Sequence, residues 1–252
     1  MRGGDAVITS SRVSAIGQRL FRWRGWLPAP VIALLLWVVA GASASPGPGG
    51  AAVDGALKVL GVVFALAGES LRFFTLGQVP EGTSGQGYAL EASALNTRGP
   101  YAYVRNPLYL GNLGICAGLL LVANNAWTYV IGLGFFSVEY FFIIRAEESF
   151  LREKYGQRFE EYASSVPRWL PRLAPVNAGR LRSTFDWARA LKKEHNPFAL
   201  WASAMLLLLV WQSHRRGLLT PSVLTVLLSL EAVVLIVFAT TKAFKRGWFR
   251  AR

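Results

Sequence analysis

Prolines, tyrosines and arginines gather where one apolar run begins, in the segment RGPYAYVRNPLYLGN over residues 98–112. Pro107 fits the first turn of a helix, where unpaired backbone N–H groups favour an anionic or hydrogen-bond-accepting ligand. Tyr101 and Tyr109 can stack on a flat ring and offer hydroxyl groups. The segment therefore predicts a ligand-binding site, although Arg105 and the tyrosines also fit an ordinary anchor at the membrane interface.

Carboxylates at the end of another apolar run form a second group. Glu147 and Glu148 are adjacent, and Glu139 lies two helical turns deeper in the run. Such groups are costly in a membrane unless they are solvated or paired. Arg145 and Glu148 are three residues apart, so the spacing predicts that they pair on one helical face.

A third charged group, Glu69 and Arg72, stands near the end of a further apolar run. The three groups come from different runs but are expected at the same membrane level. This convergence favours a site, with Glu69, Arg72 and Glu139 as candidate substrate contacts. An apolar substrate could enter such a site sideways from the lipid, while a soluble cofactor enters from the cytoplasm.

Other kinds of site find no support in the sequence. The segment GTSGQG over residues 82–87 lacks the lysine of a phosphate-binding loop and reads as a flexible loop. No Ser/His/Asp set has credible spacing. Cys116, His195 and His214 are too few and too scattered to predict a metal centre.

The composition predicts a membrane protein that positions these groups on helices. Of 252 residues, 53% are hydrophobic and only 16% are charged, against about 25% in soluble domains. Mean hydropathy is +0.35. We predict an all-α, polytopic bundle of about six spans, the third and fourth forming a helical hairpin joined at Asn124-Asn125. The expected spans are residues 29–42, 51–76, 108–124, 127–145, 198–212 and 218–241.

Basic residues predict the orientation of the chain. The net charge is +13, and the basic residues flank the apolar runs, which favours anionic lipid headgroups as partners and not nucleic acid. Lysines and arginines concentrate in the N-terminal segment, in residues 146–196 and in the C-terminal tail, so we expect both termini and the site to be cytoplasmic. Arg215-Arg216 is discordant with this topology. The small residues at 42–44 imitate a signal-peptide cleavage site, but the long basic segment before them favours an uncleaved span.

The segments GPYAYVRNPLYLGN and EESFLREKYGQRFEEYASSVPRWLP resemble the isoprenylcysteine carboxyl methyltransferase and phospholipid methyltransferase superfamily. Its pattern is Gly-Pro-Tyr, then Arg-His-Pro-x-Tyr-x-Gly, then a Glu-Glu pair, then Tyr-Gly and Val-Pro-Arg. The resemblance covers about residues 68–171. It implies a membrane-embedded enzyme that uses S-adenosyl-L-methionine to methylate a lipid, prenylated or otherwise apolar acceptor.

The resemblance also assigns residues to roles. It points to Glu147 and Glu148, and we expect these two, with the neighbouring Arg145, to contribute to catalysis. The cofactor-binding residues that it implies are Tyr101, Arg105, Asn106, Pro107, Tyr109, Gly111, Tyr162 and Arg168.

The chain departs from the family pattern at Asn106, where the family has histidine. Asparagine can hold a cofactor by hydrogen bonds but cannot act as a general base. Deprotonation of the acceptor would then fall to Glu147 or Glu148, or the acceptor must already be a good nucleophile. Methyl transfer from a sulfonium mainly needs an aligned, desolvated nucleophile, so the change does not exclude it.

Two other functions stay open. Sterol-type reductases, which use NADPH, have a similar C-terminal arrangement, but Leu108–Asn112 fits their pattern less well. A non-catalytic membrane scaffold that keeps the fold is favoured by Asn106. The oligomeric state stays open.

The expected organisation is a basic interfacial segment (1–27), spans one and two (28–76), a methyltransferase-like core with spans three and four and a cytoplasmic cofactor-binding segment (77–175), a basic amphipathic linker (176–197), and spans five and six with a basic tail (198–252).

Overall fold

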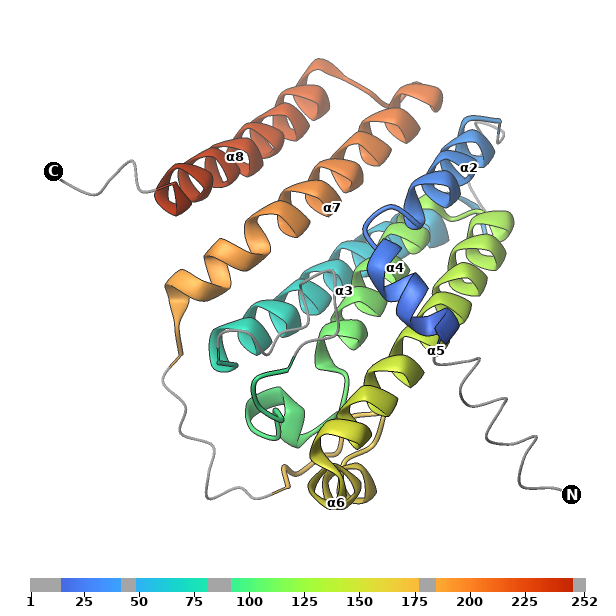
Figure 1. Ribbon diagram of the computed structural model, residues 1–252. Coiled ribbons are helices and arrows are strands. Elements are labelled where there is room, and N and C mark those ends of the chain that lie inside the picture. The colour runs from blue at the N-terminus through green and yellow to red at the C-terminus, as the bar shows by residue number, and fades with distance from the viewer. Residues whose placement is uncertain (1–14, 42–48, 81–91, 177–184, 247–252) are drawn as a thin grey trace, which may run out of the picture.

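The computed structural model describes residues 15–41, 49–80, 92–176 and 185–246, and every regular element in these ranges is a helix (Figure 1). The expectation of an all-α protein is confirmed for this part of the chain. An unlabelled helix, Ala15–Trp23, comes first. The labelled elements are α2 (Pro28–Gly41), α3 (Gly50–Gln78), the 3-10 helix η1 (Gly99–Ala102), α4 (Pro107–Ala123), α5 (Ala126–Tyr155), α6 (Gln157–Ser165), α7 (Trp187–Arg215) and α8 (Pro221–Lys245).

Four of the described helices, α3, α5, α7 and α8, are long and apolar enough to cross a membrane. The helix Ala15–Trp23 and α2 could form a fifth span with a bend of 66° between them. Helix α4 has 17 residues and a length of about 26 Å, slightly less than the hydrocarbon core of a bilayer. Each predicted apolar run is therefore helical, and the described chain supports four or five spans.

Helix α7 does not begin where the fifth span was expected. It starts at Trp187, where the Asp186 side chain accepts a hydrogen bond from the backbone N–H of Arg189 at 2.8 Å. This capping bond satisfies a free N–H group of the first turn. The helix then continues through Pro197, so the expected division between linker and span at residue 197 falls inside one helix.

Small residues hold α3 and α4 in close contact. A Cβ atom added at Gly118 would collide with the backbone oxygen of Gly61, and one added at Gly114 would press on the Cα atom of Gly68. The sequence indicates only that some helix could approach α4 closely at these glycines. The structure identifies that helix as α3. Next to this contact lies the buried apolar core, formed by Ala65, Val122, Trp201, Ala202, Met205 and Val234.

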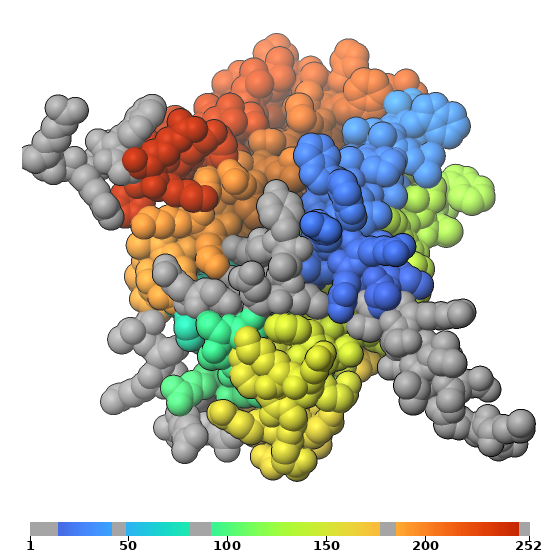
Figure 2. All heavy atoms as spheres, viewed as in Figure 1, coloured from blue at the N-terminus to red at the C-terminus, as the bar shows by residue number. Residues whose placement is uncertain are grey.

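The first described helix packs against α5. Gly17 lies against the backbone of Phe142 and the side chain of Ala146, and Phe21 is only 1% exposed. The expectation for residues 1–27 was a basic helix in the interface or a basic tail. Residues 1–14 lie outside the described chain, and the remainder is a helix whose inner face is covered by protein. Figure 2 shows this segment, in dark blue, beside the yellow atoms of α5 and α6.

The start of α3 carries a buried carboxylate with several partners. Asp54 is 2% exposed and accepts hydrogen bonds from Asn124 at 3.0 Å and from the Arg216 guanidinium, with Lys58 at 2.9 Å. These groups join α3 to the α4–α5 turn and to the end of α7. Arg216, which is discordant with the expected topology, is therefore neutralised within the protein, so it is a poor guide to orientation.

We expect the substitution Asp54→Asn to lower the free energy of unfolding by about 2 kcal/mol, because it removes the counter-charge of a largely buried guanidinium. Denaturant titration of the purified protein in detergent measures the change. Asp186→Asn is the matched control, because Asp186 is 41% exposed and asparagine caps a helix as well as aspartate does. Equal losses in the two variants would contradict a structural role for Asp54.

Candidate functional site

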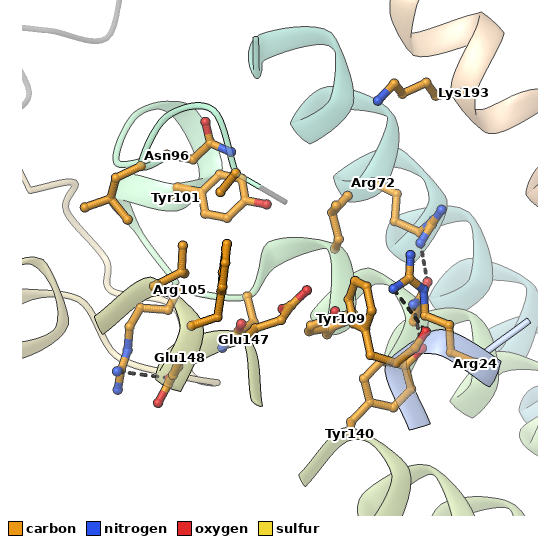
Figure 3. Close-up of a pocket in the computed structure, with 18 of the residues that line it drawn as sticks. Arg24, Arg72, Asn96, Tyr101, Arg105, Tyr109, Tyr140, Glu147, Glu148 and Lys193 are labelled. Atoms are coloured by element: carbon orange, nitrogen blue, oxygen red, sulfur yellow. Dashed lines mark hydrogen bonds and ion pairs between the residues drawn. The ribbon is translucent and has the colours of Figure 1, made fainter. Parts of the chain in front are cut away.

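A cavity of about 690 Å³ opens where the charged ends of the helices meet. This volume lies within the range of about 300–1,000 Å³ that is usual for small-molecule sites. Its wall combines the first helix, α3, η1, α4, α5, α6 and the ends of α7 and α8. Figure 3 shows part of this wall. The sequence-predicted residues that line it are Arg72, Tyr101, Arg105, Asn106, Tyr109, Glu147, Glu148 and Tyr162.

Glu147 belongs to α5 and faces this cavity together with Tyr109 of α4 (Figure 3). The Tyr109 hydroxyl donates a hydrogen bond to the Glu147 carboxylate. The ring of Tyr109 packs edge-on against Tyr140, with 4.8 Å between ring centroids. Glu147 therefore presents a carboxylate to the cavity from a position fixed by an aromatic neighbour.

Glu148, by contrast, is committed to two arginines. Its carboxylate accepts two hydrogen bonds from Arg168, at 2.9 and 2.5 Å, and lies 3.1 Å from a guanidinium nitrogen of Arg105. These contacts raise the pKa of Arg168. The predicted pair between Arg145 and Glu148 is wrong. Arg145 is exposed and lies over the Phe141 ring, because α5 turns Glu148 toward the segment that carries Arg168.

Asn106 fixes the corner before α4. Its side-chain N–H donates to the backbone oxygen of Arg168 at 3.1 Å, and the backbone N–H of Arg105 donates to Pro167 at 2.8 Å. Pro107 follows as the first residue of α4. Asn106 thus holds the segment after α6 against the start of α4, and it lines the cavity at the same time.

Two tyrosines outside the apolar spans line the opposite side of the cavity. The Tyr162 hydroxyl donates to the backbone oxygen of Tyr101 at 2.9 Å, which joins α6 to η1. Burial raises the pKa of both phenols well above the ordinary value. Both side chains therefore remain neutral, and they offer flat faces and a hydroxyl donor to a ligand.

Several predicted site residues lie outside the cavity wall. Gly111 is buried against Arg72 and the backbone of α3, so it serves the contact between α3 and α4. Glu69 is 8% exposed and accepts a hydrogen bond from Trp201 at 2.9 Å. The others that do not line the cavity are Pro107, Glu139, Arg145 and Arg168.

The partner of Arg72 is a residue that the sequence pattern did not indicate. Its guanidinium pairs with Glu194 of α7 at 2.7 Å and donates to the side-chain oxygen of Asn112. Asn112 in turn donates to the Tyr140 hydroxyl at 2.7 Å. This chain of hydrogen bonds joins α3, α4, α5 and α7, and its members Arg72, Asn112 and Tyr140 line the cavity.

Sequence reasoning also missed part of the cavity wall. Phe21 and Arg24 come from a segment interpreted only as interfacial, although their helical spacing could have indicated a packed face. Further wall residues come from the last two long helices, namely Lys192, Lys193, His195, Asn196, Pro197 and Lys245. The basic residues of the expected amphipathic linker, residues 176–197, were the signal that could have indicated these wall residues.

Comparison with known proteins finds a family match over the part of the chain that carries many of the cavity-lining residues. Residues 57–158 match the phospholipid methyltransferase family. A cobalt-zinc-cadmium resistance protein, CzcN, of Cupriavidus metallidurans is 39% identical over 83 residues, which is 32% of this chain and 38% of that protein. The match thus spans under two fifths of the relative's length. No solved structure matches the chain.

The matched range includes η1, α4, α5 and the start of α6, and therefore most of the cavity wall, together with α3. The long apolar helices belong to the same chain. This is an integral membrane protein whose residues 57–158 match the phospholipid methyltransferase family, within the isoprenylcysteine and phospholipid methyltransferase superfamily.

Proposed function

We propose that this protein transfers a methyl group from S-adenosyl-L-methionine to an apolar, lipid-like acceptor. The observation that carries the proposal is the placement of Glu147 and Tyr109 on the cavity wall, within the family-matched range. A carboxylate beside neutral tyrosine rings is suited to a cofactor that carries a sulfonium, an ammonium group and a flat purine. When bound, this cofactor supplies the electrophilic methyl carbon.

The residues of the chain would hold the cofactor and prepare the acceptor. Tyr101 and Tyr162 provide flat, uncharged faces for the purine, and Glu147 provides the negative charge that complements its cationic part. Glu148 is neutralised by two guanidiniums and is better placed to hold the wall together than to bind a ligand. Binding in the cavity would replace part of the water shell of the acceptor with protein, which favours displacement at a sulfonium.

A proton must leave any acceptor that is a hydroxyl, a thiol or an ammonium group. Asn106 cannot take it. Glu147 can, because its carboxylate faces the cavity and is not held by the two guanidiniums that bind Glu148. The bound cofactor would supply the methyl group that replaces this proton and would leave as S-adenosylhomocysteine. The proton passes to Glu147 and then to water.

We further propose that the site and both termini face the cytoplasm, within a bundle of about six spans. The support is the concentration of lysine and arginine in the segments on that side. Anionic lipid headgroups are the expected partners of these basic segments. The objection raised by Arg216 is weakened by its ion pair with Asp54.

Equilibrium binding to the purified, detergent-solubilised protein tests this function. We expect saturable binding of S-adenosylhomocysteine with a micromolar dissociation constant, and no saturable binding of NADPH. Binding of NADPH alone would overturn the proposal in favour of a sterol-type reductase. Binding of neither compound would overturn it in favour of a non-catalytic scaffold.

A further inference from the structure

The ends of α7 and α8 contribute to the cavity although both helices lie outside the matched family range. Lys192, Lys193 and His195 come from α7, and Lys245 is the last residue of α8. Figure 3 shows Lys193 extending from α7 toward the side of the cavity that Arg72 lines. Part of the cavity wall therefore comes from helices outside the matched range.

Contacts within the protein hold the cavity-lining ends of α7 and α8 in place. The buried ion pair between Arg72 and Glu194 attaches the beginning of α7 to α3. His195 is 6% exposed and stacks on Phe238 of α8, with 5.8 Å between ring centroids. The Lys192 ammonium lies 5.1 Å from the centre of the Phe244 ring, also on α8. The lysines therefore lie on two helices, α7 and α8, that pack against each other.

Charge is distributed unevenly along the cavity. The end formed by α5 and α6 carries Glu147 and the neutralised Glu148. The end formed by α7 and α8 carries Lys192, Lys193 and Lys245. Among the described residues, neither Lys192 nor Lys245 forms an ion pair within the protein. Such cations near the low dielectric of a membrane attract an anion to this end.

The surface beside these lysines is apolar. Helix α8 has a window of mean hydropathy 2.5, and only 6% of that window is buried within the protein. Val237 and Phe244 are among its exposed side chains, and the Phe244 ring lies beside Lys192. A molecule with an anionic group at Lys192 and Lys245 would find hydrocarbon next to it.

From these observations we propose that α7 and α8 form the acceptor end of the cavity, and that Lys192 and Lys245 bind a phosphate or carboxylate group of a lipid-like acceptor whose tail lies along α8. The role of this molecule as the methyl acceptor rests on the proposed methyl transfer. The binding of the anionic amphiphile can be tested independently of it.

Binding of monododecyl phosphate and sodium dodecanoate, with dodecyl maltoside as the uncharged comparison, tests the proposal by native mass spectrometry of the full-length protein. We expect the two anionic compounds to bind at least about tenfold more tightly than the uncharged one. The double substitution Lys192→Ala/Lys245→Ala should remove most of this preference, since each lysine near a membrane surface attracts an anionic lipid by about fivefold. Lys192→Arg/Lys245→Arg should keep it.

Lys242→Ala is the matched control, because Lys242 lies one turn before Lys245 on α8 and does not line the cavity. If Lys242→Ala weakens binding as much as the double substitution, general surface charge explains the preference and the proposal is overturned. Inorganic phosphate competing as well as monododecyl phosphate would overturn the assignment to a lipid. S-adenosylhomocysteine binding, measured in parallel, reports on methyl transfer separately: its absence beside a retained anion preference would reject the proposed function and leave the anion site intact.

Discussion

Methyl transfer by the variant Glu147→Gln is expected to be at least about 100-fold slower than by the unaltered protein, with little change in stability. Glutamine keeps the size of the side chain and can still accept the hydrogen bond from Tyr109. It cannot take a proton from the acceptor or balance a cationic cofactor. Initial rates with a labelled methyl donor measure the loss, and the affinity for S-adenosylhomocysteine separates binding from chemistry.

Glu153→Gln is the matched control for this experiment, because Glu153 is an exposed carboxylate of the same helix and does not line the cavity. Its rate should stay close to that of the unaltered protein. A Glu147→Gln rate within about threefold of the original, below the usual contribution of acid–base groups, would show that Glu147 is not the residue that prepares the acceptor.

Glu148→Gln is expected to act in a different way, lowering the free energy of unfolding by about 3 kcal/mol. The substitution leaves the guanidiniums of Arg105 and Arg168 without their shared counter-charge, and the Arg105 side chain is only 16% exposed. The segment after α6 should loosen from the start of α4, because only the hydrogen bonds of the Asn106 side chain and of the Arg105 backbone N–H would then hold it there. Denaturant titration measures the stability, and hydrogen exchange at residues 166–176 measures the loosening.

Glu160→Gln provides the comparison. Glu160 also pairs with an arginine, Arg152, but both side chains are about half exposed. Loss of such a surface pair should cost less than about 1 kcal/mol. If Glu148→Gln and Glu160→Gln prove equally stable, the double arginine pair does not support the cavity wall.

The contrast between Glu147 and Glu148 follows from helix geometry. Adjacent residues of an α-helix point about 100° apart, so neighbouring carboxylates meet different surroundings. Both line the cavity, but only Glu148 is paired with two arginines. The sequence motif shows that both acids are present, but the division of roles depends on what surrounds the helix.

Much of the architecture was predictable because hydrophobicity is a local property of the chain. Long apolar runs identified the helices, and Asn124-Asn125 marked the turn between α4 and α5. Glycines on α4 indicated that a neighbour could approach closely. These predictions need only the sequence within a few turns of each helix.

The pairing of charges was not predictable in the same way. Spacing along one helix predicted that Arg145 would meet Glu148, whereas the partners of Glu148 come from two other segments. Arg72 pairs with Glu194, which lies 122 residues away in the chain. Local spacing carries no information on such contacts, because they depend on which helices pack together.

The contribution of the last two long helices was missed for a related reason. The family pattern ends before them, and their basic residues were interpreted as contacts with lipid headgroups. Only the folded chain brings Lys192 and Lys245 to the cavity that Glu147 lines. Charge composition predicted an affinity for anions there, and packing determined that the cations line a site.

Incorporation of label from methyl-labelled S-adenosyl-L-methionine into an organic-solvent extract tests the central claim most directly. Purified protein is incubated with membrane lipids, and the Glu147→Gln variant is run alongside. We expect label in the lipid fraction with the unaltered protein and at least about 100-fold less with the variant. Equal incorporation by both proteins, or none by a protein that is folded and supplied with total membrane lipid, would contradict methyl transfer at this site.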